Sequence, residues 1–98
     1  MADIHLYDVI RRPVVTEKTQ VMTDEQNVYA FEVDKRANKV QIRQAVEEIF
    51  GVSVLRVRTL VVAPKQGRRA RRVFIRKPAW KKAYVTVAPG QSIDLFGV

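Results

Sequence analysis

The sequence predicts an α+β fold, with a small and mostly antiparallel sheet of about three or four strands and helices packed on one face. Three observations lead to this class. One segment alternates apolar and polar residues, a second has the apolar spacing of a helix, and two later segments are rich in β-branched residues. The expected core is therefore β-α-β-β, with a long basic hairpin loop at 64–79. The 98 residues are expected to form a single domain, 1–98.

A short helix is expected first, from about Glu17 to Glu25. The Thr16 hydroxyl can accept a hydrogen bond from an amide of the first turn and so act as the N-cap. Glu17 then lies in that turn, where the helix dipole favours negative charge. Pro13 precedes the helix, because proline is excluded from a helix interior.

The first strand of the core is expected at 27–34. Tyr29, Phe31 and Val33 share one face of it, and this face is expected to be the buried one. A polar turn at 34–37 follows and leads to the main helix.

The main helix is expected to begin after Asn38. Asn38 as N-cap and Gln41 three residues later form the pattern of a capping box. Gly51 follows the helix and suits a left-handed C-cap. One helical face is apolar and is expected to face the sheet; it consists of Ile42, Ala45, Val46, Ile49 and Phe50.

A long β-branched strand is expected at 52–63. Strict alternation places Val54, Arg56 and Arg58 on one face and Leu55 on the other.

The last strand is expected at about 80–88, paired with the preceding one as an antiparallel hairpin. After Pro89 and Gly90, a short tail can pack back on the core through Ile93, Leu95 and Phe96. The hairpin connection spans about fifteen residues, where about two to five are usual, so a functional role is expected for it.

Positive charge is concentrated in the second half of the chain. Residues 1–50 carry seven basic and nine acidic side chains, whereas residues 51–98 carry eleven basic and one acidic. The run 65–82 holds nine Lys or Arg residues and no acid. Solvated faces usually mix both signs, so this asymmetry indicates a polyanionic partner, with nucleic acid preferred over an anionic membrane.

The candidate RNA-binding residues follow from this charge pattern. Arg residues suit phosphate because the planar guanidinium can bond two oxygens, and an aromatic ring beside them can stack on a base. The candidates are Arg11, Arg12, Lys35, Arg36, Arg56, Arg58, Lys65, Arg68, Arg69, Arg71, Arg72, Arg76, Lys77, Trp80, Lys81 and Lys82. For Trp80, partial packing on the core is the preferred interpretation, and packing and stacking on a base can both hold at once.

The inventory of reactive side chains argues against an enzyme. The chain has one histidine, His5, and no cysteine, so neither a metal cluster nor a cysteine nucleophile is expected. Glycine-rich phosphate-binding motifs are missing as well, and no cofactor is expected. Neither a signal peptide nor a membrane span is expected from the apolar pattern.

Four stretches carry a resemblance to a known family: "RPVVTEKT", "NKVQIRQAVEEIFGV", "TLVV" and "WKKAYVTVAPGQSIDLFG". In this order and spacing they resemble the bacterial large-subunit ribosomal protein twenty-three family, over nearly the whole chain. The resemblance implies a structural, non-catalytic protein in the cytoplasm, which binds large-subunit ribosomal RNA near the exit of the peptide tunnel and lies beside neighbouring large-subunit ribosomal proteins.

The resemblance also implies a docking face for trigger factor, the signal recognition particle and the translocon. In the family the docking glutamate lies in an "[ST]-E-K" motif, which here gives Glu17 that role. Phe50, at the end of the main helix, lies on the same side in the family. Gly51 stands where some relatives carry an acid, so the ionic contact that such an acid could make is not expected at this position.

Two other functions remain open. A free-standing RNA-binding module with an exposed sheet would usually show interleaved aromatic residues on its strands, and the charge here lies mainly in a loop. A protein-interaction module could use the basic loop to bind an acidic partner. Co-sedimentation with ribosomes and nuclease sensitivity would separate these functions.

Overall fold

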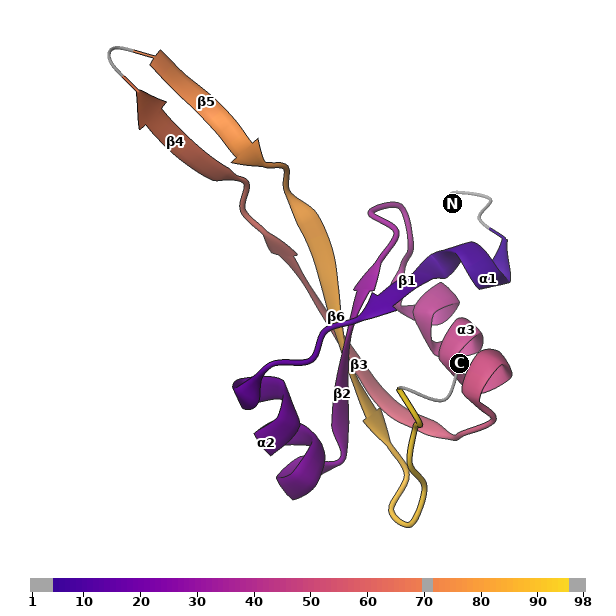
Figure 1. The fold of residues 1–98 in the computed structure, drawn as a ribbon. Coiled ribbons are helices and arrows are strands. Elements are labelled where there is room, and N and C mark those ends of the chain that lie inside the picture. Colours follow the sequence, from indigo (N-terminus) through magenta and orange to yellow (C-terminus); the bar gives the residue numbers. More distant parts are fainter. Residues whose placement is uncertain (1–4, 70–71, 96–98) are drawn as a thin grey trace.

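The computed structural model describes residues 5–69 and 72–95. For residues 65–69 and 72–77 it describes the backbone alone. Figure 1 shows a body built around a sheet and a ribbon of two strands that projects from it. The elements, in chain order, are α1 (Leu6–Val9), β1 (Ile10–Pro13), α2 (Glu17–Gln26), β2 (Val28–Val33), α3 (Lys39–Phe50), β3 (Val54–Val62), β4 (Lys65–Arg69), β5 (Arg72–Lys77) and β6 (Trp80–Val87).

The body contains a four-stranded antiparallel sheet with the order β1-β2-β6-β3, which confirms the predicted α+β class. β3 and β6 pair as the predicted hairpin, and β6 lies between β2 and β3. The sequence interpretation missed α1 and β1. The β1 segment is short and polar on its exposed side, so its pattern is too weak to predict a strand.

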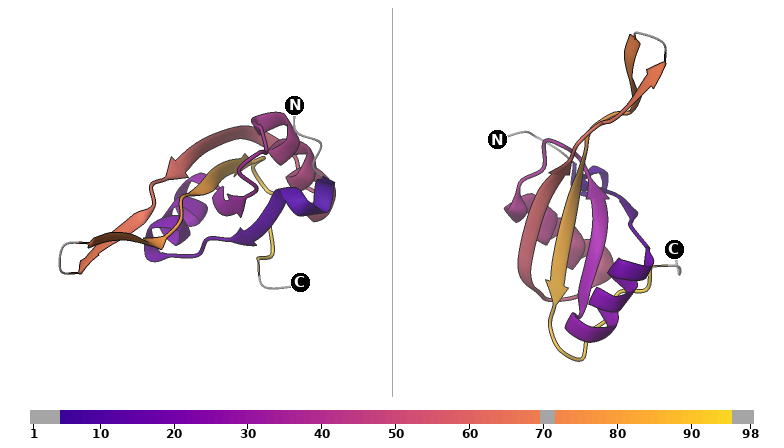
Figure 2. Two further views of the ribbon diagram at one scale, coloured as in Figure 1. Left: turned by 90° about the horizontal axis from the view of Figure 1, so that it is seen from above. Right: turned by 90° about the vertical axis from the view of Figure 1, so that its left-hand side faces the viewer.

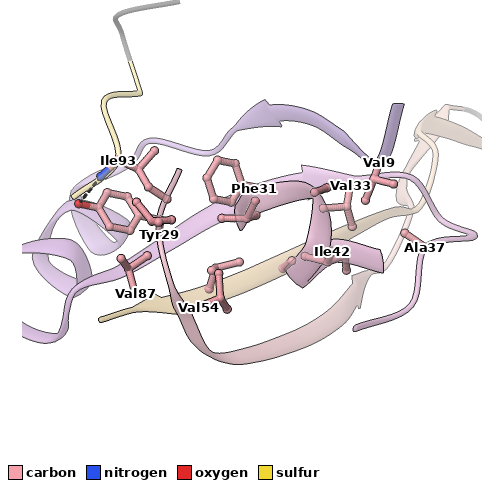
Figure 3. Packing of buried hydrophobic residues seen from close by; sticks show 14 residues of the cluster. Val9, Tyr29, Phe31, Val33, Ala37, Ile42, Val54, Val87 and Ile93 are labelled. Atoms are coloured by element: carbon pink, nitrogen blue, oxygen red, sulfur yellow. Dashed lines mark hydrogen bonds between the residues drawn. The ribbon is translucent and has the colours of Figure 1, made fainter. Parts of the chain in front are cut away.

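Helix α3 covers one face of the sheet and closes the core. Phe31 of β2 and Ile42 of α3 are both 0% exposed, and Ala83 and Val85 of β6 are buried beside them. All four belong to one core cluster, in which Figure 3 shows Phe31 of β2 and Ile42 of α3 between helix and strands. The tail joins this core through Ile93, which is buried and whose N–H donates to the Tyr29 hydroxyl at 3.1 Å, and Leu95 packs against the core. Phe96 lies outside the described residues.

Helix α2 packs on the face of β2 that is opposite to α3. The right-hand view of Figure 2 shows α2 in front of the sheet and α3 behind it. Val28 and Ala30, which point away from α3, are buried all the same. The Thr23 hydroxyl of α2 donates to the Val28 carbonyl at 2.7 Å. β2 is therefore buried on both faces, whereas its alternating pattern predicted one.

The ends of both long helices follow the predicted caps. The Gln41 N–H donates to Asn38 Oδ1 at 2.8 Å, and the Asn38 N–H donates to Gln41 Oε1 at 3.0 Å. Thr16 caps α2 and exchanges the same reciprocal bonds with Thr19. Gly51 ends α3 with φ of 65°, in the left-handed region that the C-cap requires.

The predicted faces of β3 are wrong at its first residues. A β-bulge lies between Val54 and Arg56, so two residues of β3 face one residue of β6. Val54 therefore pairs with Val87 and is buried, while Leu55 is 56% exposed. From Arg56 onward the predicted alternation holds, because the register is regular again.

Candidate nucleic-acid interface

The basic segment between β3 and β6 forms a ribbon, where the sequence interpretation expected a loop. β4 and β5 pair in antiparallel register and project from the body, and with them the chain has principal extents of 53 × 33 × 23 Å (Figures 1 and 2). The register places Lys65 opposite Lys77 and Arg69 opposite Arg72. Like charges at directly opposed positions destabilise a strand pair, so this ribbon favours a polyanion that offsets them.

The remaining ribbon candidates lie on the same two strands. Arg68 belongs to β4, and Arg76 to β5. Arg71 lies outside the described residues. The backbone thus gathers most of the predicted basic run on one projection, away from the core.

A second group of candidates lies on the face of the sheet that α3 does not cover. We call the β3–β6 part of this face the open face. Arg56 and Arg58 are exposed there, and they pair across the strands with Thr86 and Tyr84. Lys82 and Trp80 are half-buried on the same face. Arg56 and Arg58 therefore share one face, as alternation predicted, and this face is exposed to solvent.

Lys81 points to the other side of β6. Its ammonium donates to the carbonyl of Ala37, in the turn before α3. This hydrogen bond links the sheet to the start of the main helix, and it separates Lys81 from Lys82 despite their adjacency in sequence.

A charged cluster lies where β2 ends. Asp34 is buried, and its carboxylate accepts hydrogen bonds from the Arg36 side chain at 3.2 and 3.3 Å and from the Arg36 N–H at 2.9 Å. Arg11 approaches the same carboxylate at 3.6 Å. The hydrogen bonds from Arg36 lower the pKa of Asp34 from 3.8 to about 2. Asp34 therefore stays ionised and partly neutralises both arginines.

Two further candidates lie near this cluster. Arg12 Nε donates to Glu32 Oε1 at 3.0 Å, so its charge is also partly neutralised. Lys35 is exposed in the turn after β2. An open groove of about 580 Å³ brings several candidates together; its lining includes Arg11, Lys35, Arg36, Trp80 and Lys81.

Other kinds of site find no support among residues 5–69 and 72–95. In that part of the chain, no group of three or more His, Asp or Glu side chains could hold a metal ion. None of its helices has the length and apolarity of a membrane span.

Comparison with known proteins identifies the family. The model described as ribosomal protein L23 matches residues 8–95. The chain belongs to the ribosomal protein L23 family.

Curated relatives agree with the L23 assignment. The large ribosomal subunit protein uL23 of Desulfatibacillum aliphaticivorans is 53% identical, over 95% of this chain and 97% of the relative. The uL23 protein of Syntrophotalea carbinolica is 52% identical, over 95% and 97%. That of Geobacter sulfurreducens is 47% identical, over 97% and 100%. The L23 family consists of structural ribosomal proteins, so the chain is a ribosomal protein and not an enzyme.

The two residues assigned to docking by resemblance to the L23 family lie on different elements. Glu17 is exposed in the first turn of α2, and it forms no ion pair with the described residues. Phe50 is half-buried at the end of α3, where its ring stacks on Phe31 with centroids 5.6 Å apart. Phe50 also lines a groove with Tyr7 and Leu95. Phe50 thus serves the core, and part of its ring is left for a contact.

The sequence did not predict two residues that contact the candidate cations of this L23 chain, Tyr84 and Asp34. Tyr84 lies on the open face between two cations, Arg58 and Lys82. Asp34 organises Arg11 and Arg36, and the pattern Asp-Lys-Arg in a turn gave a local signal for at least the Arg36 contact.

Proposed function

We propose that the chain is a structural component of the large subunit of cytoplasmic ribosomes and binds large-subunit ribosomal RNA near the exit of the peptide tunnel. It would act as one domain, 1–98, and contact neighbouring large-subunit ribosomal proteins. The observation that carries RNA binding is the ribbon, in which like charges occupy opposed positions on a projection from the body. Phosphates offset this repulsion, and contacts to phosphate position a protein without reading sequence.

The candidates contribute unequally in this proposal. The carboxylates of Asp34 and Glu32 partly neutralise Arg11, Arg12 and Arg36. Residues 65–77 contain no Asp or Glu, and no described carboxylate forms an ion pair with Arg56, Arg58 or Lys82. We therefore expect the cations of the ribbon and the open face to release more counterions per contact with RNA.

The ribbon is tested by replacing Arg68, Arg69, Arg71 and Arg72 with Ala. RNA binding should weaken, and the slope of log K against log salt should fall by about 3 units, at about 0.7–0.9 per phosphate contact. A matched control replaces Lys18 and Lys39, which are exposed on α2 and α3 outside the proposed interface. An unchanged slope in the four-residue variant would remove the ribbon from the interface.

We further propose that Glu17 and Phe50 belong to a docking face for trigger factor, the signal recognition particle and the translocon. The support is the exposed carboxylate of Glu17, which has no ion pair among the described residues, together with the resemblance of "TEK" to the family's docking motif. Glu17→Ala should reduce recruitment of trigger factor to ribosomes and leave folding intact. Glu25→Ala is the control, because Glu25 is exposed near the other end of the same helix. Equal recruitment by both variants would refute the role of Glu17.

A free-standing RNA-binding module is the second candidate function, favoured by the aromatic and basic residues of the open face. Sedimentation of a lysate at low and high salt distinguishes the two. A ribosomal component stays with the large subunit at high salt, and a free module remains near the top of the gradient. Loss of the association with salt but not with nuclease would instead indicate an acidic protein partner.

A further inference from the structure

The open face carries an alternating row of aromatic and cationic side chains. Lys82 Nζ lies 5.3 Å from the ring centroid of Trp80 and 5.6 Å from that of Tyr84. Arg58 Cζ lies 5.6 Å from the Tyr84 ring, across the strand pair. We call the four residues Trp80, Lys82, Tyr84 and Arg58 the cation–aromatic row.

The rings hold these cations in place and leave their charge intact. A cation within about 6 Å of a ring centroid is attracted to the ring face, but the ring supplies no counter-charge. Among the described residues, no carboxylate pairs with Lys82 or Arg58. Glu32 is the register neighbour of Lys82, yet its carboxylate pairs with Arg12. The row therefore offers positive charge beside flat apolar rings, and this charge has no ion-pair partner among the described residues.

We propose that the cation–aromatic row binds an unpaired, extended segment of ribosomal RNA. Bases stack on Trp80 and Tyr84, and the connecting phosphates lie against Lys82 and Arg58. This inference rests on the proposed RNA-binding function and adds a distinct mode to it. The ribbon contacts phosphates, whereas the row recognises exposed base faces.

Spacing favours an unstacked strand over a helix. Alternate residues of a strand lie about 6.6–6.8 Å apart, so Trp80 and Tyr84 are separated by about 13 Å. Nucleotides stacked in B-form DNA advance only about 3.4 Å along each strand. The bases of an A-form RNA duplex are likewise stacked, so their faces are covered by neighbours. An extended single strand leaves base faces free, and stacking on aromatic residues is its usual mode of protein contact.

Charge and ring content together favour RNA over an acidic protein segment. An acidic peptide could pair its carboxylates with Lys82, Arg58 and the nearby Arg56, but it has no bases to stack on Trp80 and Tyr84. A single-stranded nucleic acid can place its phosphates against the cations and stack its bases on the rings.

Fluorescence provides the test, because Trp80 is the only tryptophan of the chain. The full-length protein is titrated with a single-stranded oligouridine and with a duplex RNA of equal length. The oligouridine should quench Trp80 strongly, and the duplex should quench it much less. Binding without quenching, or equal quenching by the duplex, would overturn the proposal.

Variants separate stacking from charge. Tyr84→Leu keeps an apolar side chain, and it should raise the Kd for the oligouridine about 5- to 150-fold if one base stacks on the ring. Tyr7→Leu is the control, because Tyr7 is 64% exposed on α1, outside the row. Arg58→Ala, a change at an exposed side chain, should weaken binding and preserve the quenching. An unchanged Kd for Arg58→Ala would contradict the proposal, and this test remains available even if Tyr84→Leu proves unstable.

The same titration keeps this inference apart from the ribbon. The variant lacking Arg68, Arg69, Arg71 and Arg72 should still show Trp80 quenching by oligouridine, with a smaller salt dependence. If its salt slope is unchanged while quenching persists, the ribbon proposal fails and the row stands. If polyglutamate quenches Trp80 and displaces the oligouridine, the row is an acidic-protein site and the present proposal fails.

Discussion

Strand β6 presents Ala83, Val85 and Val87 to one side of the sheet and Lys82 and Tyr84 to the other. The first three are 0–1% exposed beneath α3. The other two remain half-exposed, together with the cations of β3. The two faces are built on the same backbone and hydrogen-bond ladder, so the ladder alone does not explain why the body is stable.

This difference separates the stability of the sheet from its proposed binding function. Burial of apolar area on the α3 side stabilises the fold by about 25 cal/mol per Å². The open face contributes little such burial. The residues of the open face are therefore constrained little by folding. Substitutions on this face should affect binding more than they affect folding.

The largest effect is expected from Phe31→Ala. Phe31 is 0% exposed and stacks on Phe50, so the change leaves a cavity in the centre of the core. Phe→Ala changes at such sites cost about 3–5 kcal/mol, a large part of the about 5–15 kcal/mol that typical domains have. Chemical denaturation would measure the loss. A cost below about 1 kcal/mol would mean that the α3 face is not the main source of stability.

A smaller effect is expected from a matched pair on neighbouring positions of β6. Val85→Ala removes two buried methyl groups and should cost about 1.5–2.5 kcal/mol. Thr86→Ala, on the opposite face, should stay within about 0.5 kcal/mol. Thermal unfolding of the two variants compares the faces on one strand. Equal costs would show that the open face also contributes to the core.

The smallest effect is expected at Asp34, at the end of β2. Its pKa is lowered to about 2 in the folded chain and is ordinarily 3.8. The stabilisation from its ionised form is thus complete above about pH 4, and it is lost as the pH falls toward 2. Asp34→Asn should lower the Tm by a few degrees at pH 7.

The control for this prediction is the same pair of proteins at low pH. The difference in Tm between the parent chain and Asp34→Asn should shrink between pH 4 and pH 2. A difference that does not change with pH would mean that the charge of Asp34 is not what stabilises the turn.

Much of the fold could be predicted from local patterns. The apolar spacing from Ile42 to Phe50 indicated the face of α3, and Asn38, Gln41 and Gly51 marked its ends. These signals are strong because capping and periodicity depend on neighbours in sequence. The bulge at Leu55 and the burial of Val28 and Ala30 could not be predicted in this way. Both depend on which strand or helix packs against the segment, and the local sequence does not contain this information.

Some residues of the candidate site could likewise be placed from local patterns, whereas the contacts of others depend on distant parts of the chain. Net charge pointed to the ribbon, and alternation placed Arg56 and Arg58 on an exposed face. The separation of Lys81 from Lys82 also follows from alternation, but the bond of Lys81 to Ala37 requires the turn before α3 to lie beside β6. The partial neutralisation of Arg11 by Asp34 likewise joins residues that are distant in sequence.

The strand order β1-β2-β6-β3 has a consequence for how the chain acquires its structure during synthesis. β2 and β3 do not pair with each other; both pair with β6, which follows them in the chain. Until residues 80–87 have been made, β3 has no partner in this sheet and β2 can pair only with β1. Asn27 adds to this dependence, because its side-chain amide donates to the carbonyls of Val87, Ala88 and Gln91. Since contacts distant in sequence form slowly, we expect the sheet to assemble late and in one step, after the emergence of β6.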